Sequence, residues 1–294
     1  MENGLQAKGL TKAYGKNEVL HGVDLTLEQG KIYGLIGRNG AGKTTLLSLL
    51  TAQNRPTAGT VTYNGEPVWE NSRALGEICF SRELSPMLLW GQNTLKVKEY
   101  LRAASVYYPH WDAAYAAQLV TAFDLDTKKR ICKLSKGMMS MLTIVLALAS
   151  RAPITILDEP VAGLDVVARE QFYDFLLADY AETNRTFVIS THIIEEAAKV
   201  FEDIIVLDEG RIVAAGNCEE FVNGYCYVSG RDEDVDAVCV QRTVINCETL
   251  GRSKICCVNA SAQEMSAATQ GATLDISSAS LQKIFVFLTS KKER

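Results

Sequence analysis

The sequence has no apolar run long enough to cross a bilayer, and its beginning lacks the apolar core of a signal peptide. The longest apolar run lies near 142–149, far below the ~20 residues that a spanning helix needs. Residues 1–10 mix polar and apolar side chains. We therefore expect a cytoplasmic chain. If it works at a membrane, a separate protein must supply the spanning part.

The sequence also lacks an excess of basic residues. It has 30 Lys and Arg against 35 Asp and Glu, a formal net charge of −5 at pH 7. A chain that binds nucleic acid by neutralising phosphates is usually basic, so we expect no nucleic-acid partner. The 47% hydrophobic content excludes a disordered chain, and 294 residues fit one large domain or two unequal ones.

The eight cysteines contain no C-x-x-C pair, and the three histidines do not lie at metal-ligand spacing. This excludes the common zinc-site patterns. Because no export signal is visible, we expect the cysteines to be reduced thiols that act mostly as small core residues. Six of the eight cysteines lie beyond Asn217.

Strand and helix signals alternate through most of the chain. Asn64-Gly65, between two short strand-like runs, is typical of a hairpin turn. The strand signals lie at 5–12, 23–27, 31–36, 59–69, 76–80, 154–157, 186–190 and 203–207. The helix signals begin at Thr44 and continue at 95–108, 111–123, 138–150 and 168–180. Strands that alternate with helices predict an α/β fold with a parallel sheet.

The composition changes near Asn217, where short apolar runs separated by Gly, Asn and acidic residues begin. We therefore expect two domains, 1–216 and 217–294. The second is predicted to be a small β-rich or α+β appendage that ends in a helix over 281–289. Its role is open between regulation and support of a dimer.

Residues 37–44 form a glycine-rich loop between a strand signal and a helix signal, and they satisfy the Walker A pattern G-x-x-x-x-G-K-[ST]. The glycines let backbone N–H groups point at phosphate oxygens, and the helix N-terminus adds partial positive charge. Lys43 is expected to reach the β- and γ-phosphates, and the Thr44 hydroxyl to coordinate Mg²⁺. The expected phosphate-binding residues are Gly37, Asn39, Gly40, Ala41, Gly42, Lys43, Thr44 and Thr45.

A second motif places two adjacent carboxylates at the end of the strand signal at 154–157. Parallel sheets bind ligands at this carboxyl edge. Asp158 is expected to hold Mg²⁺, directly or through water, and Glu159 to act as the general base that polarises the attacking water. In isolation such a pair is usually a solvated turn. Beside a phosphate-binding loop it indicates nucleotide hydrolysis.

With these motifs in this order, residues 4–216 resemble the nucleotide-binding subunit of an ATP-binding cassette (ABC) transporter. The resemblance implies a P-loop NTPase fold: a RecA-like parallel sheet, an N-terminal antiparallel β subdomain and an α-helical subdomain at 85–135. It places Tyr14 on the adenine ring, a contact of ~1–3 kcal/mol in nucleic-acid systems. It also assigns Asp165 to the D-loop, and His192 to a switch that contacts the γ-phosphate and the attacking water.

The sequence Leu-Ser-Lys-Gly-Met at 134–138 resembles the family signature, which is ordinarily Leu-Ser-Gly-Gly-Gln. In the family this loop binds the γ-phosphate of ATP held by the opposite subunit, so the resemblance assigns that role to Ser135, Lys136 and Gly137. One chain carries one phosphate loop and one signature. A second nucleotide-binding subunit is therefore implied, most simply another copy of this chain arranged head to tail.

Two features depart from the family pattern. Lys136 and Met138 alter the signature, either as a working variant that resembles a branch of small multi-subunit exporters, or through decay. Arg82 replaces a Gln that touches Mg²⁺, and arginine cannot ligate a metal. Arg82 either contacts a phosphate or a carboxylate such as Glu159, or points to solvent. The apolar residues at 87–90 form either a partner surface or core.

Three functions fit the sequence. The first is an ATP-hydrolysing subunit, with ATP and Mg²⁺ as cofactors, that powers an exporter through a separate transmembrane permease. This subunit would lie on the cytoplasmic face of the membrane. The second is a soluble ABC-type ATPase, but this chain lacks the coiled-coil insertion or second cassette usual there. The third is a regulatory module that binds ATP with weak hydrolysis. It is disfavoured by intact Lys43, Thr44, Asp158, Glu159 and His192.

Overall fold

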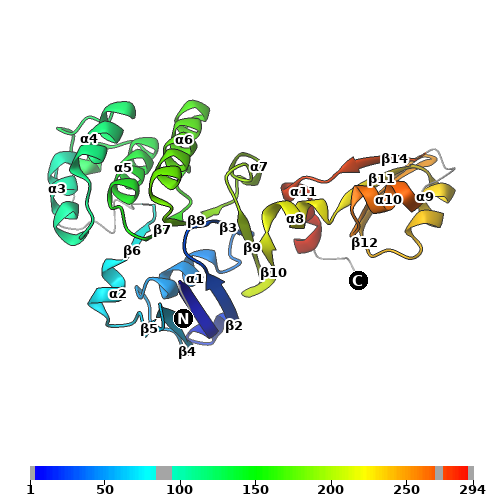
Figure 1. Ribbon diagram of the computed structural model, residues 1–294, viewed down its shortest axis with the longest axis horizontal. Coiled ribbons are helices and arrows are strands. Elements are labelled where there is room, and N and C mark those ends of the chain that lie inside the picture. Colours follow the sequence, from blue (N-terminus) through cyan, green and yellow to red (C-terminus); the bar gives the residue numbers. More distant parts are fainter. Residues whose placement is uncertain (1–3, 84–94, 269–273, 291–294) are drawn as a thin grey trace. The chain divides into compact units, whose positions relative to one another are not determined.

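The computed structural model describes residues 4–83, 95–268 and 274–290 (Figure 1). The chain divides into two compact units. The first consists of Met1–His192 with Ile205–Ala214, and the second of Ile193–Ile204 with Ala215–Arg294. No helix in the described ranges is both long and apolar enough to pass through a membrane.

The first unit contains an antiparallel sheet of order β2-β1-β4-β5. Its strands are β1 (Leu5–Tyr14), β2 (Asn17–Leu27), β4 (Ala58–Tyr63) and β5 (Glu66–Pro67). Asn64 and Gly65 form the two-residue turn between β4 and β5, and their φ values of 50° and 85° are those that such a turn requires. The predicted hairpin is confirmed.

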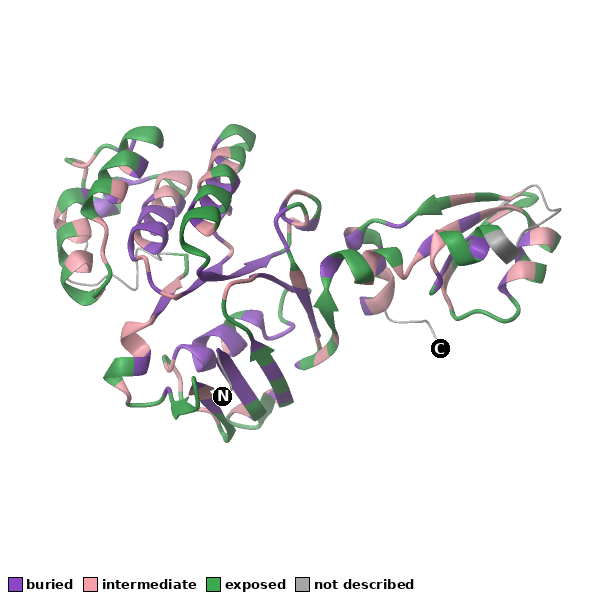
Figure 2. Ribbon diagram, viewed as in Figure 1, coloured by how far each residue is buried: buried purple, intermediate pink, exposed green. Residues whose placement is uncertain are grey.

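A six-stranded sheet of order β10-β9-β3-β8-β7-β6 forms the centre of this unit. Its strands are β3 (Ile32–Ile36), β6 (Ile78–Ser81), β7 (Ile154–Asp158), β8 (Thr186–Thr191), β9 (Asp203–Asp208) and β10 (Arg211–Asn217). The pairs β3–β8, β8–β7 and β7–β6 are parallel. Strands β3, β7 and β8 are buried along their whole length, which explains their continuous apolar character (Figure 2).

Helices cover both faces of this sheet. Figure 1 shows α5 and α6 on one side, and α1 with the antiparallel sheet on the other. The helices are α1 (Lys43–Leu50), α2 (Ser72–Gly76), α3 (Val97–Tyr107), α4 (Ala113–Ala122), α5 (Lys136–Ala149) and α6 (Val166–Thr183), with a 3₁₀ turn at Ile131–Lys133. The predicted α/β fold with a parallel sheet and a helical region is confirmed. The apolar residues at 87–90 lie outside the described residues.

Helices α5 and α6 each begin two residues before their predicted starts because a polar side chain caps the first turn. The Ser135 hydroxyl accepts a hydrogen bond of 3.2 Å from the Met138 N–H. The Asp165 carboxylate accepts one of 2.9 Å from the Ala168 N–H. Both caps satisfy an N–H group that the helix itself leaves unpaired.

A buried ion pair joins α6 to the central sheet. The Arg185 guanidinium donates to both carboxylate oxygens of Asp179, at 2.9 and 2.5 Å, and also to the Thr155 hydroxyl and the Leu148 carbonyl. Arg151 approaches the same carboxylate at 3.0 Å. Asp179 is 1% exposed, and the two guanidinium groups offset the cost of burying its carboxylate.

The second unit contains an antiparallel sheet of order β12-β13-β11-β14. The chain order is β11 (Cys226–Arg231), α9 (Asp232–Cys239), β12 (Val244–Leu250), β13 (Ser253–Val258), α10 (Ala262–Ala268) and β14 (Asp275–Ser278). This β-α-β-β-α-β order is that of a ferredoxin-like module. The same unit contains α7 (Ile194–Ala197), α8 (Cys218–Asn223) and α11 (Leu281–Thr289). The α+β expectation and the final helix are confirmed.

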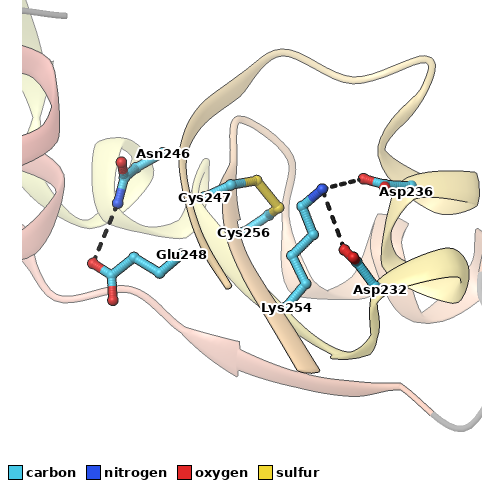
Figure 3. The surroundings of a disulfide bond; sticks show 7 residues. All are labelled: Asp232, Asp236, Asn246, Cys247, Glu248, Lys254 and Cys256. Atoms are coloured by element: carbon cyan, nitrogen blue, oxygen red, sulfur yellow. Dashed lines mark hydrogen bonds and ion pairs between the residues drawn. A yellow bond between two sulfur atoms is a disulfide. The ribbon is translucent and has the colours of Figure 1, made fainter. Parts of the chain in front are cut away.

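The structure corrects one expectation about the cysteines. Cys247 and Cys256 face each other on β12 and β13 and form a disulfide with a Cα–Cα distance of 4.1 Å (Figure 3). The expectation of reduced thiols is therefore wrong for this pair, because strand register is invisible to a spacing rule. The other six cysteines are free, and burial raises the pKa of Cys226 and Cys257 to about 11. Those two thiols stay protonated at neutral pH.

We predict that Asp179→Asn lowers the free energy of unfolding of the first unit by ~3–5 kcal/mol, because Arg185 would lose its buried carboxylate partner. Urea denaturation followed by tryptophan fluorescence measures this, since all three tryptophans lie before residue 193. The control is Glu66→Gln, which removes an exposed pair with Arg73 and should cost less than ~1 kcal/mol. Equal small losses in both variants would contradict the prediction.

Candidate functional site

The loop between β3 and α1 depends on three glycines. Gly40 and Gly42 have φ values of 83° and 106°, a region that side-chain-bearing residues rarely adopt. A Cβ on Gly37 would lie 2.6 Å from the Leu207 carbonyl oxygen, which no real Cβ tolerates. The glycines therefore allow the tight turn with which the backbone enters α1.

Lys43, the first residue of α1, is 8% exposed, and its ammonium group lies inside the loop. It donates a hydrogen bond of 2.7 Å to the Gly37 carbonyl. The same ammonium lies 3.8 Å from a carboxylate oxygen of Glu159. A buried cation thus stands between the loop backbone and the end of β7.

The Asp158 carboxylate joins the ends of three chain segments. Its Oδ2 accepts a hydrogen bond of 2.7 Å from the Thr44 hydroxyl, which belongs to α1. Its Oδ1 accepts a hydrogen bond from the Ser190 hydroxyl of β8. Asp158 is the last residue of β7 and is 7% exposed. Ser190 was not among the expected site residues; its only sequence signal was its position before Thr191 and His192.

Glu159 leaves β7 with a φ of 53°, in the left-handed region that is uncommon for residues other than glycine. Its N–H donates a hydrogen bond of 3.0 Å to the Ser190 carbonyl. Its Oε2 lies 2.7 Å from the His192 Nδ1. The Glu159 side chain is 23% exposed and that of His192 is 56% exposed, so water can reach the pair.

A hollow of about 340 Å³ lies over the loop. It is lined by Val19, Arg38, Asn39, Gly40, Gly42, Lys43, Thr44, Thr45 and Glu159. The structure thus brings six of the eight expected phosphate-binding residues together with Glu159; Gly37 and Ala41 do not line the hollow. Val19 of β2 carries no motif and was not found from the sequence. Ala41 is buried, and its N–H donates a hydrogen bond of 3.1 Å to the Arg38 carbonyl.

Among the residues that the structure describes, several others named from the sequence do not line this hollow. Tyr14, at the end of β1, is 48% exposed, and the Lys12 ammonium lies 4.9 Å from its ring centroid. Ser135 and Asp165 are the helix caps described above. Arg82, just beyond β6, is exposed.

The first turn of α5 packs against the loop at 161–165 of the same chain. A Cβ on Gly137 would lie 2.7 Å from the Gly163 carbonyl oxygen, so a glycine is required there. The Ser140 hydroxyl donates a hydrogen bond of 2.6 Å to the Ala162 carbonyl. Only Pro160 separates this loop from Glu159, so α5 supports the turn that carries the Glu159 side chain.

Comparisons with known proteins agree with this geometry. A family model described as ABC transporter matches residues 20–162. The Nod factor export ATP-binding protein I of Paraburkholderia xenovorans is 31% identical over 85% of each chain. The bacitracin transport ATP-binding protein BcrA of Enterococcus faecalis is 32% identical over 75% of this chain and 71% of its own. YtrB of Bacillus subtilis, an ABC transporter ATP-binding protein, is 28% identical over 79% and 78%.

Solved structures share the fold. An ATP-binding subunit of an ABC transporter superposes with a TM-score of 0.64 at 24% identity, covering 91% of this chain and all of the other. A dimeric cassette in a post-hydrolysis state with ADP and Pi gives a TM-score of 0.62 at 22% identity, covering 73% and 98%. The fold, the family match and the relatives agree, and the chain belongs to the ATP-binding subunits of ABC transporters, which bind and hydrolyse ATP.

Proposed function

We propose that this chain powers export through a separate transmembrane permease, from the cytoplasmic face of the membrane. The proposal is carried by the contacts between the phosphate loop and the two carboxylates at the end of β7. The Thr44 hydroxyl donates a hydrogen bond to Asp158, and the Lys43 ammonium forms an ion pair with Glu159. The names of two relatives, Nod factor export and bacitracin transport, support a transport role. The first of these names supports the direction.

The oxygen atoms at the end of β7 fit Mg²⁺, which needs few protein ligands, better than they fit a metal that is held by protein side chains alone. The Thr44 hydroxyl and the Asp158 carboxylate supply two adjacent oxygen atoms. No cluster of three or more His, Cys, Asp or Glu among the described residues could hold a metal by itself. Mg²⁺ typically takes one or two protein oxygens and completes its shell with substrate phosphates and water. When bound, it would neutralise charge that develops on the phosphate oxygens.

The chain's own groups then divide the work. Entry of a triphosphate would draw the Lys43 ammonium from the Gly37 carbonyl to the β- and γ-phosphates, while the N–H groups of the loop hold the phosphate oxygens. Glu159 would accept a proton from the attacking water. His192, 2.7 Å from Glu159, would orient that carboxylate and contact the γ-phosphate.

A second subunit completes the site in this proposal. Within one chain, the hollow over the phosphate loop is not lined by the signature residues or by the D-loop aspartate, which are Ser135, Lys136, Gly137 and Asp165. A head-to-tail pair of subunits would bring these residues to the ATP bound by the partner. A dimeric cassette with ADP and Pi among the structural neighbours supports such a pair. Tyr14, which is exposed at the end of β1 in the same unit as the loop, is proposed to stack on adenine.

Two further regions have roles outside the ATP site in this proposal. The segment at 85–135, which includes α3 and α4, would receive the permease, and Arg82 precedes it. Residues 217–294 would form a separate accessory domain after the cassette at 1–216. The division into two compact units supports a separate C-terminal part, although the second unit also includes Ile193–Ile204.

We predict that Glu159→Gln lowers steady-state ATP turnover at least ~100-fold and preserves ATP binding, because an amide cannot accept the proton of water. Phosphate release measures turnover, and fluorescent-nucleotide titration measures binding. Glu170→Gln, an exposed carboxylate on α6, is the matched control and should keep wild-type turnover. Turnover of the Glu159→Gln protein within about fivefold of wild type would remove Glu159 from the role of general base.

We also predict that Thr44→Val raises the Mg²⁺ concentration needed for half-maximal turnover by ~10-fold or more, because it deletes one proposed ligand and keeps the side-chain shape. Turnover measured across a Mg²⁺ titration at saturating ATP tests this. Thr62→Val on β4 removes a hydroxyl from the antiparallel sheet and is the control. The same Mg²⁺ dependence in both variants would show that the Thr44 oxygen is not a ligand.

A further inference from the structure

Lys136, one of the two residues that depart from the family signature, forms an ion pair with an acidic residue from a distant part of the chain. Its Nζ lies 3.2 Å from the Oε1 of Glu83. Glu83 follows β6, whereas Lys136 is the first residue of α5. Their side chains are 54% and 57% exposed. The positive charge that the altered signature introduces is therefore paired with a carboxylate of the same subunit.

The stem of Lys136 is held by the loop that follows Glu159. A Cβ on Gly163 would lie 2.8 Å from the Lys136 Cγ and 3.2 Å from its Cδ, so the stem runs directly across this glycine. Gly163 has a φ of 80°, which favours glycine independently. The first part of the side chain thus packs against the loop, whereas the ammonium at its end contacts Glu83 on the exposed surface.

The Glu83–Lys136 pair has the properties of a contact that can be replaced. Ion pairs between exposed side chains contribute little to stability and are weakened by salt. The first turn of α5 reads Lys-Gly-Met-Met and carries no acid of its own, so its N-terminal partial charge attracts anions. A terminal phosphate carries more negative charge than one carboxylate. It therefore competes with Glu83 for the same ammonium.

We propose that Glu83 and Lys136 form an inhibitory latch, an inference that rests on the proposed closing of two subunits around ATP. In the open subunit Glu83 holds the Lys136 ammonium. On closing, Lys136 exchanges the carboxylate for the terminal phosphate of the ATP on the partner subunit. Lys136 then favours the closed dimer, and Glu83 opposes it.

The two residues must therefore have opposite effects, which a merely stabilising ion pair would not give. The experiment measures the ATP concentration for half-maximal dimerisation by sedimentation, using the full chain with Glu159→Gln as the parent. Adding Glu83→Gln is expected to lower this concentration about two- to fivefold, the range for one exposed ion pair. Adding Lys136→Gln is expected to raise it. Adding both should match Lys136→Gln alone, because no ammonium is left to release.

Glu66→Gln in the same parent is the matched control. It removes another half-exposed carboxylate, one paired with Arg73, and should leave the ATP dependence unchanged. A parent that dimerises while Glu83→Gln and Lys136→Gln shift the ATP dependence in the same direction, or not at all, would overturn the latch and leave the proposed function standing. A parent that does not dimerise with ATP would overturn the proposed subunit pairing and the latch with it.

Discussion

The site depends on the hydrogen bonds that the buried carboxylate of Asp158 accepts. It accepts hydrogen bonds from Thr44 and Ser190, so it fixes the start of α1 and the end of β8 against the end of β7. A carboxylate with 7% exposure requires such partners, because an unpaired buried charge is strongly unfavourable. The pairing that satisfies Asp158 also sets the phosphate loop beside Glu159. Stability and chemistry therefore share the same contacts.

The parallel sheet explains why these residues meet. Strands β3, β7 and β8 run in one direction, and each delivers its following loop to the same edge. The loops then adopt backbone conformations that extended strands cannot provide, including positive φ at Gly42 and Glu159. Such a conformation at Glu159 costs energy of order 1–3 kcal/mol and persists only where the surroundings impose it. Here the Ser190 carbonyl and the start of α5 restrain the turn.

Local sequence patterns predicted the helices, strands and turns, but they did not predict the contacts between residues far apart in the sequence. The alternation of strands and helices, the Asn64-Gly65 turn and the loop at 37–44 each rest on neighbouring residues, so the sequence was sufficient. The Ser190–Asp158 bond, the Cys247–Cys256 disulfide and the Glu83–Lys136 pair depend on register and packing between distant segments. For the same reason the strand order of the second unit was left open, although its α+β character and final helix were predicted.

The central claim, that ATP hydrolysis here drives a separate permease, is tested most directly by its physical partner. The Glu159→Gln protein would be captured with and without ATP from detergent-solubilised native membranes, and the co-purifying chains identified by mass spectrometry. The account predicts a polytopic membrane protein in stoichiometric amount, together with two copies of this chain when ATP is present. Recovery of this chain alone, or with a soluble partner only, would contradict the claim.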